Sequence, residues 1–200
     1  MISFLDHNNS EPYKIFRNKY EEALNKNQQI IEAINIASYN ITSQKVNSRF
    51  VNLKYVIDEE WIFFSNYNSK KAKEFIDHDQ IFVSIYWSAI NFQIRMSAKV
   101  FKTNSKFSDK HYSTRNLDKN TLAFISNQSS EVESYDKILK KYDKAIKEKH
   151  SYINKRPDYW GGFSFKPNYF EFWEGHESRI NKRQYFKKDG DDWKKGYLEP

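Results

Sequence analysis

The chain has 200 residues, a length that favours a single domain with its own hydrophobic core. It contains no cysteine, which excludes disulfides, thiolate zinc sites, iron–sulfur clusters and a cysteine nucleophile. A formal charge of +7 and an aromatic content of 18% suit either a nucleic-acid binder or a protein that holds a small phosphorylated aromatic.

The first half of the chain predicts one helix followed mainly by strands. Residues 12–25 place Tyr13, Phe16 and Tyr20 at helical spacing between charged residues. Short segments rich in β-branched and aromatic residues follow, each bounded by polar clusters, and they predict strands at 32–40, 48–56, 60–65, 80–87 and 92–102. Ser69 is placed to cap a short helix at 70–78.

The second half predicts helices and then strands again. Two short helices and a longer charged one are expected at 107–116, 119–127 and 131–149. After Pro157 the pattern predicts strands at 161–174, 182–187 and 191–198. No linker divides the chain, so we expect one domain over residues 1–200, mainly β with flanking helices, built as a small antiparallel barrel.

Several classes of site and location have no support in the sequence. The N-terminal segment has no export signal and no apolar run is long enough to span a membrane, so we expect a cytoplasmic protein without a membrane partner. The histidines lack metal-ligand spacing, and we expect no metal site. No glycine-rich phosphate loop is present, so a bound nucleotide would be held by side chains and strand backbone.

Anion-binding side chains gather next to the predicted strand ends. Arg49 begins one strand and Lys54 ends it, while Ser65 to Lys71 join a strand to a helix N-terminus, where free N–H groups favour a phosphate. Taken singly, each such residue is more typical of a solvated surface. Because Arg49 and Lys54 are five residues apart, a regular strand would point them to opposite faces. A shared ligand would therefore require a bulge, or two sides of an interface.

Six motifs, in order along the chain, resemble those of the pyridoxamine 5′-phosphate oxidase family. They are Ser48 to Lys54, Phe63 to Ala72, Gln93 to Arg95, Ser126 to Ser130, Trp160 to Phe163, and Glu171 to Trp173 with Arg179 and Arg183. The resemblance covers about residue 10 to the C-terminal proline, with a C-terminal dimerisation and signature region at about 157–200.

The resemblance implies an FMN-binding split β-barrel that forms a homodimer, with FMN sites built from both chains. The implied cofactor-binding residues are Arg49, Phe50, Val51, Asn52, Leu53, Lys54, Phe64, Ser65, Lys70, Lys71, Gln93, Gln128, Ser129, Trp173 and Arg183. The implied contacts to a phosphorylated pyridine substrate are Lys54, His111, Arg115, Lys119, Arg179 and Asn181, of which Arg179 and Asn181 would lie at the reacting carbon.

Four positions depart from the family pattern. Lys70 stands where the family usually has arginine, and His111 and Lys119 stand where it usually has tyrosine and serine. Lys70 keeps the charge but loses bidentate geometry, whereas His111 adds charge only if it is protonated. Asn181 replaces a histidine and cannot carry a proton at neutral pH.

The resemblance implies oxidation of pyridoxamine or pyridoxine 5′-phosphate to pyridoxal 5′-phosphate, with O₂ as the acceptor and H₂O₂ as a product. Two alternatives remain open: an FMN oxidase of the same family that acts on another small aromatic of the phenazine type, and a flavin- or pyridoxal-phosphate-binding protein without turnover. Nucleic-acid binding is not expected.

Overall fold

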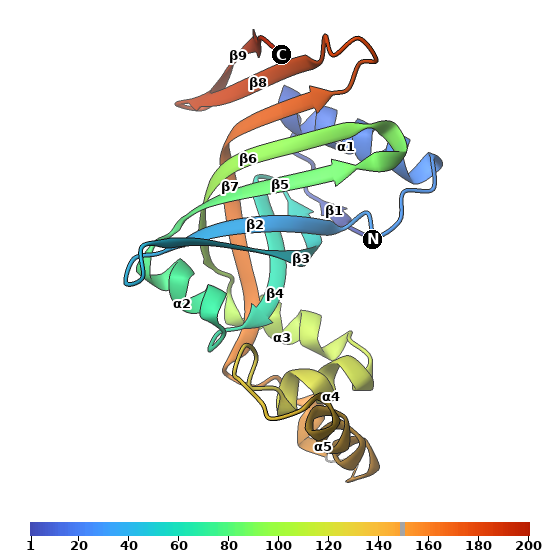
Figure 1. Ribbon diagram of the computed structural model, residues 1–200. Helices are drawn as coiled ribbons and strands as arrows, with labels where there is room; N and C mark the ends of the chain where they lie inside the picture. Colours follow the sequence, from blue (N-terminus) through green and yellow to red (C-terminus); the bar gives the residue numbers. More distant parts are fainter. Residues whose placement is uncertain (149–150) are drawn as a thin grey trace.

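The computed structural model describes residues 1–148 and 151–200. This part of the chain contains nine strands and five α-helices (Figure 1). The strands are β1 (Ser3–Leu5), β2 (Ala33–Asn40), β3 (Lys45–Ile57), β4 (Glu60–Asn66), β5 (Gln80–Trp87), β6 (Phe92–Lys102), β7 (Trp160–Glu174), β8 (Lys182–Asp189) and β9 (Asp192–Leu198). The helices are α1 (Glu11–Asn25), α2 (Lys70–Asp77), α3 (Ser105–Ser113), α4 (Leu117–Ile125) and α5 (Tyr135–Glu148), with short 3₁₀ turns at Ser88–Ile90 and Ser151–Asn154.

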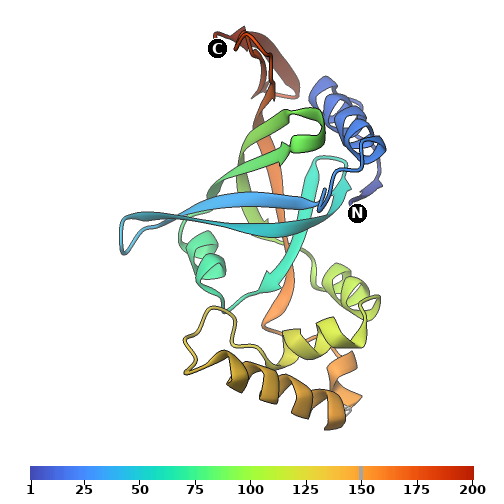
Figure 2. The ribbon, with the colours of Figure 1, turned by 45° about the vertical axis from the view of Figure 1, so that its right-hand side comes forward.

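The sheet closes into a barrel through β4. Strands β3, β2, β5, β6 and β7 are consecutive antiparallel neighbours, and β4 pairs with both β3 and β7. The first part of β7 pairs with β4 (Trp160 to Phe165), whereas its last part pairs with β8 (Tyr169 to Glu174). The β8–β9 hairpin therefore extends the sheet beyond the barrel, at the opposite end of the molecule from α3, α4 and α5 (Figures 1 and 2).

Alternation along the strands fills the barrel with apolar side chains. In β2, β5 and β6 every second residue is buried, including Ile36, Val83 and Ile94. Helix α1 packs on this core because its aromatic residues recur on one face, and the rings of Phe16 and Trp61 lie 4.3 Å apart. No helix in the described part of the chain is long and apolar enough to cross a membrane.

The predicted elements are present, and their bounds differ at a few places. Strand β3 begins three residues before the predicted start because it forms a hairpin with β2 through residue 45. Helix α5 begins at Tyr135 and not at residue 131, since the Ser134 hydroxyl accepts the Lys137 N–H as a cap. Residue 149, the predicted end of this helix, lies outside the described residues. The sequence did not predict β1, a three-residue strand parallel to β3.

Two β-bulges change which face the side chains occupy. The pairing of β3 with β4 shifts between Leu53 and Tyr55, and the pairing of β7 with β6 shifts where Asn168 is the extra residue. In β7 the phenylalanines that pack in the core are consequently odd-numbered before the bulge (Phe163 and Phe165) and even-numbered after it (Phe170 and Phe172).

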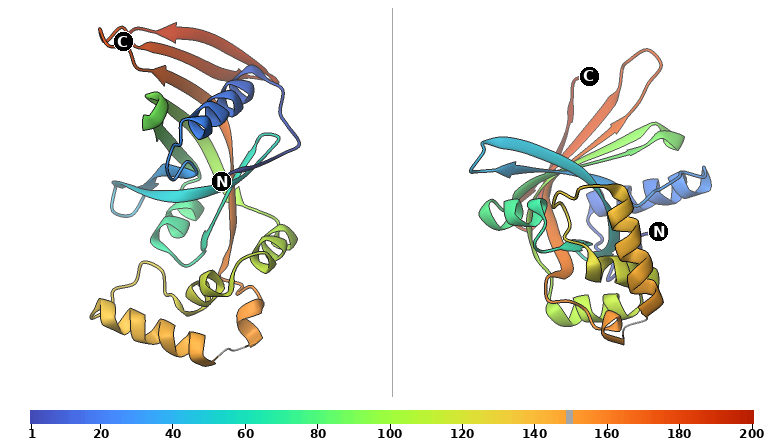
Figure 3. Two further views of the ribbon diagram at one scale, coloured as in Figure 1. Left: turned by 90° about the vertical axis from the view of Figure 1, so that its right-hand side faces the viewer. Right: turned by 60° about the horizontal axis from the view of Figure 1, so that its bottom comes forward.

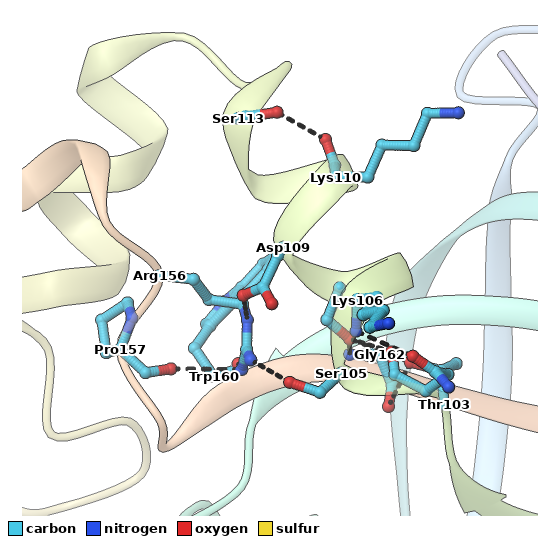
Figure 4. A network of polar contacts seen from close by, with 12 residues as sticks. Thr103, Ser105, Lys106, Asp109, Lys110, Ser113, Arg156, Pro157, Trp160 and Gly162 are labelled. Carbon is cyan, nitrogen blue, oxygen red and sulfur yellow. Dashed lines mark hydrogen bonds and ion pairs between the residues drawn. The ribbon is translucent and has the colours of Figure 1, made fainter.

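Arg156 fastens α3 to the start of β7 (Figure 4). Its guanidinium donates to Asp109 of α3 at 2.6 Å, to Ser105 at 2.7 Å and to the carbonyl oxygen of Trp160 at 2.6 Å. Close packing is possible here because Gly162 has no side chain: its N–H donates to the Ser108 hydroxyl at 3.1 Å. A Cβ at Gly162 would come within 2.5 Å of the Thr103 side chain.

Candidate active site

A cavity of about 980 Å³ lies between β3, the end of β4, and helices α2, α3 and α4. Its described lining holds a single carboxylate, Glu74, against six cationic side chains, which are those of Arg49, Lys54, Lys70, Lys71, Arg115 and Lys119. Such an excess of positive charge around one cavity favours an anion, and phosphate groups are the anions best held by several charge-assisted hydrogen bonds.

Glu74 organises one end of the cavity. Its carboxylate is 3% exposed and accepts hydrogen bonds from the Ser38 hydroxyl, from Asn47 at 2.7 Å and from Arg49 at 3.0 Å. Arg49 also donates to the Ser38 hydroxyl. These bonds hold the Arg49 guanidinium at the cavity wall, and they lower the pKa of Glu74, so that its charge persists at neutral pH despite burial, which acts in the opposite direction.

Lys71 lies beside this ion pair at the N-terminus of α2. Its ammonium donates to the Ser65 hydroxyl at 2.9 Å and is largely buried. Burial and the neighbouring Arg49 lower the pKa of Lys71 to about 8, although Glu74 partly opposes them. Ser69 is the N-cap residue as predicted, but its hydroxyl donates to the Asn66 carbonyl and caps no N–H. The helix N-terminus therefore keeps donors free for an anion.

The loop after α4 closes over the end of β4. The side-chain oxygen of Gln128 accepts the Asn66 N–H at 3.1 Å and the Ser65 hydroxyl at 3.3 Å. Ser129 follows with φ of 73°, a left-handed conformation that is uncommon for a residue with a side chain. Both residues line the cavity, as the sequence predicted for a site.

Arg49 and Lys54 line the same cavity, and Lys54 is itself the extra residue of the β3 bulge. The conflict that a regular strand would have created is thus removed within one chain. Leu53 behaves differently: its side chain is fully buried in the core and does not line the cavity, because it points to the inner face of the barrel. Only its backbone could serve a ligand.

Parallel rings form one wall of the cavity next to Arg115. Phe64 stacks on His111 with ring centroids 3.7 Å apart and an interplanar angle of 9°, and on Trp160 at 5.3 Å and 10°. The Arg115 guanidinium lies 4.3 Å from the Trp160 ring. Burial, Arg115 and Lys54 lower the pKa of His111 to about 4, so the imidazole is neutral at pH 7 and does not add to the positive charge.

Gln93, Trp173 and Arg183 form a second group, away from the cavity. They are register partners on β6, β7 and β8, so they form one row across the sheet. Arg183 donates at 2.9 Å to the buried carboxylate of Glu171, which also accepts Arg95 at 2.9 Å. The row ends on β8, and the β8–β9 hairpin lies at the opposite end of the molecule from α5 (Figure 3, left).

Arg179 and Asn181 belong to the loop between β7 and β8, next to that row. Arg179 is exposed and has φ of 59°. The side-chain oxygen of Asn181 accepts the His176 N–H at 3.0 Å and thereby closes the loop. Neither residue lines the cavity of its own chain. The structure therefore divides the predicted site residues into two separate groups.

Comparison with known proteins assigns the chain to a family. Residues 160–200 match the family described as the pyridoxine 5′-phosphate oxidase C-terminal dimerisation region. The pyridoxine/pyridoxamine 5′-phosphate oxidase of Haemophilus influenzae is 32% identical over 148 residues, which are 74% of this chain and 70% of that one. The enzyme of the same name from Colwellia psychrerythraea is 30% identical over 193 residues, or 96% and 88% of the two chains. The chain belongs to the pyridoxine/pyridoxamine 5′-phosphate oxidase family.

Solved structures confirm the predicted split-barrel fold of this family. PhzG from Burkholderia lata 383, in complex with tetrahydrophenazine-1-carboxylic acid, superposes with a TM-score of 0.88 at 22% identity, covering 96% of this chain and 93% of that one. A pyridoxamine 5′-phosphate oxidase-related, FMN-binding protein from Nostoc punctiforme PCC 73102 gives a TM-score of 0.74 at 11% identity, over 92% and 97% of the chains.

Three of the four departures from the family pattern lie in the cavity, namely Lys70, His111 and Lys119. Asn181 lies in the β7–β8 loop. No cluster of three or more potential metal ligands is found among the described residues.

Several lining residues were not predicted from the sequence. These are Asn47, Ser48, Glu74, Thr114, Asn116 and Trp160. For Glu74 the sequence offered one signal. It is a carboxylate three residues after Lys71, within the short helix predicted at 70–78. Trp160 begins the motif from Trp160 to Phe163, but no contact to a ligand was predicted for it.

Proposed function

We propose that the protein is an FMN-dependent oxidase that converts pyridoxamine or pyridoxine 5′-phosphate to pyridoxal 5′-phosphate, with O₂ as the acceptor and H₂O₂ as a product. The observation that carries the proposal is the cationic cavity with its wall of stacked rings, in a chain of this family. Phosphorylated aromatic molecules require both features.

The residues at the α2 end fit the phosphate of FMN. Arg49, Lys70 and Lys71 supply charge, Ser65 supplies a hydroxyl, and the free N–H groups of α2 add donors. The exposed side of β3 from Phe50 to Asn52 offers strand backbone to the flavin ring. FMN would supply the redox chemistry when bound, by accepting two electrons from the substrate carbon and passing them to O₂.

The residues at the α3 end fit a second phosphate, that of the substrate. Lys54, Arg115 and Lys119 supply three positive charges, and His111 supplies a neutral hydrogen-bonding group. Nη1 of Arg115 is buried without a hydrogen-bond partner among the described residues, although burial lowers the pKa of this group. A buried guanidinium donor without an acceptor is costly, and a phosphate oxygen would satisfy it.

A second copy of the chain would complete the site. Gln93, Trp173 and Arg183 would contact the flavin, and Arg179 and Asn181 would lie near the reacting carbon, all from the opposite subunit of a homodimer. The support is that none of these residues lines the cavity of its own chain, although all of them lie on the neighbouring strands β6, β7 and β8 or on the loop between β7 and β8. This arrangement aligns the donor carbon with the flavin without requiring a strong protein base.

The test begins with the visible spectrum of the purified protein after FMN addition and gel filtration. Pyridoxamine 5′-phosphate is then added in air, and aldehyde and H₂O₂ are both followed. We expect a retained flavin and equal amounts of the two products. Retained flavin with no aldehyde from either vitamer phosphate would reject the substrate assignment, and failure to retain flavin would reject the cofactor.

An oxidase for another small aromatic is the second candidate, and the wall of parallel rings favours it. Phe64, His111 and Trp160 would suit any planar ligand, including one that carries a carboxylate. A protein that binds flavin but turns over neither class would be a binding protein without activity.

A further inference from the structure

Tyr55 of β3 contacts the lining residue His111 from outside the cavity lining, and the proposed function gives it no role. Its hydroxyl lies 2.9 Å from Nδ1 of His111, and the two rings meet edge to face at 5.4 Å and 83°. Tyr55 is held in turn by Phe107 of α3, whose ring lies 5.2 Å away at 74°. Tyr55 comes directly after the bulge in β3.

The direction of this hydrogen bond follows from acid–base strength. A phenol is a much stronger acid than a neutral imidazole N–H, and an imidazole nitrogen is a much better acceptor than a phenol oxygen. Burial raises the pKa of Tyr55, and burial lowers the pKa of His111, so both groups are neutral at pH 7. The Tyr55 hydroxyl therefore donates to Nδ1, and the imidazole proton resides on Nε2.

Two contacts then fix the orientation of the His111 imidazole. Stacking on Phe64 at 3.7 Å fixes the plane of the ring, and the bond from Tyr55 turns the Nδ1 edge toward a residue that does not line the cavity. No described residue forms a hydrogen bond with Nε2, and His111 lines the cavity beside Arg115.

We propose that Tyr55 is a positioning residue that holds His111 as the neutral tautomer with its Nε2–H directed at the bound substrate. His111 then acts as a donor to an oxygen of the ligand, next to the charges of Lys54 and Arg115. The part of this inference that concerns the substrate rests on the proposed function, whereas the tautomer does not.

The direct test is NMR of the protein labelled with ¹⁵N-histidine at pH 7, with the His111 signals assigned by their loss in His111→Gln. We expect a protonated Nε2 and an unprotonated Nδ1 in the wild-type protein. In Tyr55→Phe the Nδ1 resonance should move, because its donor is gone. A proton on Nδ1 in the wild type, or unchanged ring resonances in the variant, would overturn the proposal. The wild-type spectrum alone tests the tautomer even if the variant does not fold.

Tyr39→Phe is the matched control. Tyr39 also packs edge to face on a histidine, His78, with centroids 5.8 Å apart, but Nδ1 of His78 has no hydrogen-bond partner among the described residues. This variant should leave the His111 resonances unchanged, and a shift there would show that loss of any tyrosine hydroxyl disturbs the ring.

Kinetics separate this inference from the proposed function. For pyridoxamine 5′-phosphate, Tyr55→Phe should raise KM about fivefold to tenfold and change kcat less than twofold, since a ground-state contact is misaligned. The predicted NMR result without vitamer oxidation would retain the role of Tyr55 and reject the substrate. Vitamer oxidation with an unperturbed His111 in Tyr55→Phe would retain the substrate and reject the role of Tyr55.

Discussion

The buried ammonium of Lys71 is the cavity cation whose charge responds most directly to mild alkali. Its pKa of about 8 reflects burial first and Arg49 second, and a bound phosphate dianion would raise that pKa again. Affinity for FMN should therefore be constant from pH 7 to about 8. Above pH 8 the Kd should rise, by up to about tenfold per pH unit, until the pKa of the complex is reached.

Flavin fluorescence titrations between pH 7 and 9.5 measure this dependence. Lys71→Met should bind FMN about tenfold or more weakly at pH 7 and should show a flat profile up to pH 9. A flat profile in the wild-type protein would mean that Lys71 does not contact the phosphate.

Glu74 places a negative charge where an anion is expected to bind, and Glu74→Gln tests what it does there. Loss of the carboxylate leaves Arg49 without its buried partner, so the free energy of unfolding should fall by about 3 kcal/mol. Inorganic phosphate should then raise the melting temperature of the variant more steeply than that of the wild type, because the ion replaces the missing charge.

Glu60→Gln is a suitable control for Glu74→Gln, since Glu60 pairs with Lys166 at 3.4 Å away from the cavity. It should unfold close to the wild-type temperature and respond to phosphate as the wild type does. Equal phosphate responses in both variants would contradict a role for Glu74 in holding Arg49.

Among the elements, α3 is joined to the start of β7 by a hydrogen-bond network centred on one side chain. Arg156 is 9% exposed and forms hydrogen bonds with Asp109, Ser105 and the backbone of Trp160. Arg156→Met should lower the free energy of unfolding by about 2 kcal/mol. It should also raise KM more than it weakens FMN binding, because α3 carries His111 at the substrate end.

Chemical denaturation and flavin titration of the same preparation measure both effects. Lys99→Met provides the contrast: its ion pair with Asp79 is exposed and should contribute less than about 0.5 kcal/mol. Equal losses in the two variants would show that the Arg156 network does not fasten α3.

Alternating buried and exposed residues made most strands predictable, and β5 and β6 have the predicted bounds. The bulge in β3 was one of two alternatives that the spacing of Arg49 and Lys54 left open. The bulge in β7 was not predictable, since the residues on each side of it alternate normally and the change of face depends on the partner strand. The start of α5 was missed for a similar reason: the apolar spacing runs through Val132, but the Ser134 cap begins the helix later.

At the scale of the whole molecule, the cavity and the row of Gln93, Trp173 and Arg183 predict complementation between subunits. Lys71→Met damages the cavity, and Arg183→Met damages the row while leaving Glu171 bonded to Arg95. Each variant alone should be nearly inactive. Subunits exchanged at equal amounts should recover about a quarter of the wild-type sites, because half the dimers are mixed and each holds one intact site.

Activity of the exchanged mixture, measured with gel filtration on the same sample, tests this prediction. A dimer without recovered activity would show that both groups act within one chain. Mixing two preparations of Lys71→Met supplies the baseline.

The separation of these two groups also limits what sequence can predict about the site. Motif order identified both groups, and the cavity gathers Arg49, Ser65 and Gln128 as expected. Motifs carry no information on which chain supplies a residue. The electrostatic state of His111 was equally out of reach, because it depends on burial and on Arg115, which only the folded chain brings together.

The extra residue in β7 makes the length of that strand as important as its composition. Before Asn168 the strand faces the core with Phe165, and after it with Phe170. Deleting Asn168 would move every later side chain of β7 to the opposite face of the sheet. Trp173 and Glu171 would then face inward and Phe172 outward. The single extra residue thus lets one strand serve two purposes. Its first half closes the barrel, and its second half keeps Phe170 and Phe172 in the core while Trp173 lies on the other face of the sheet.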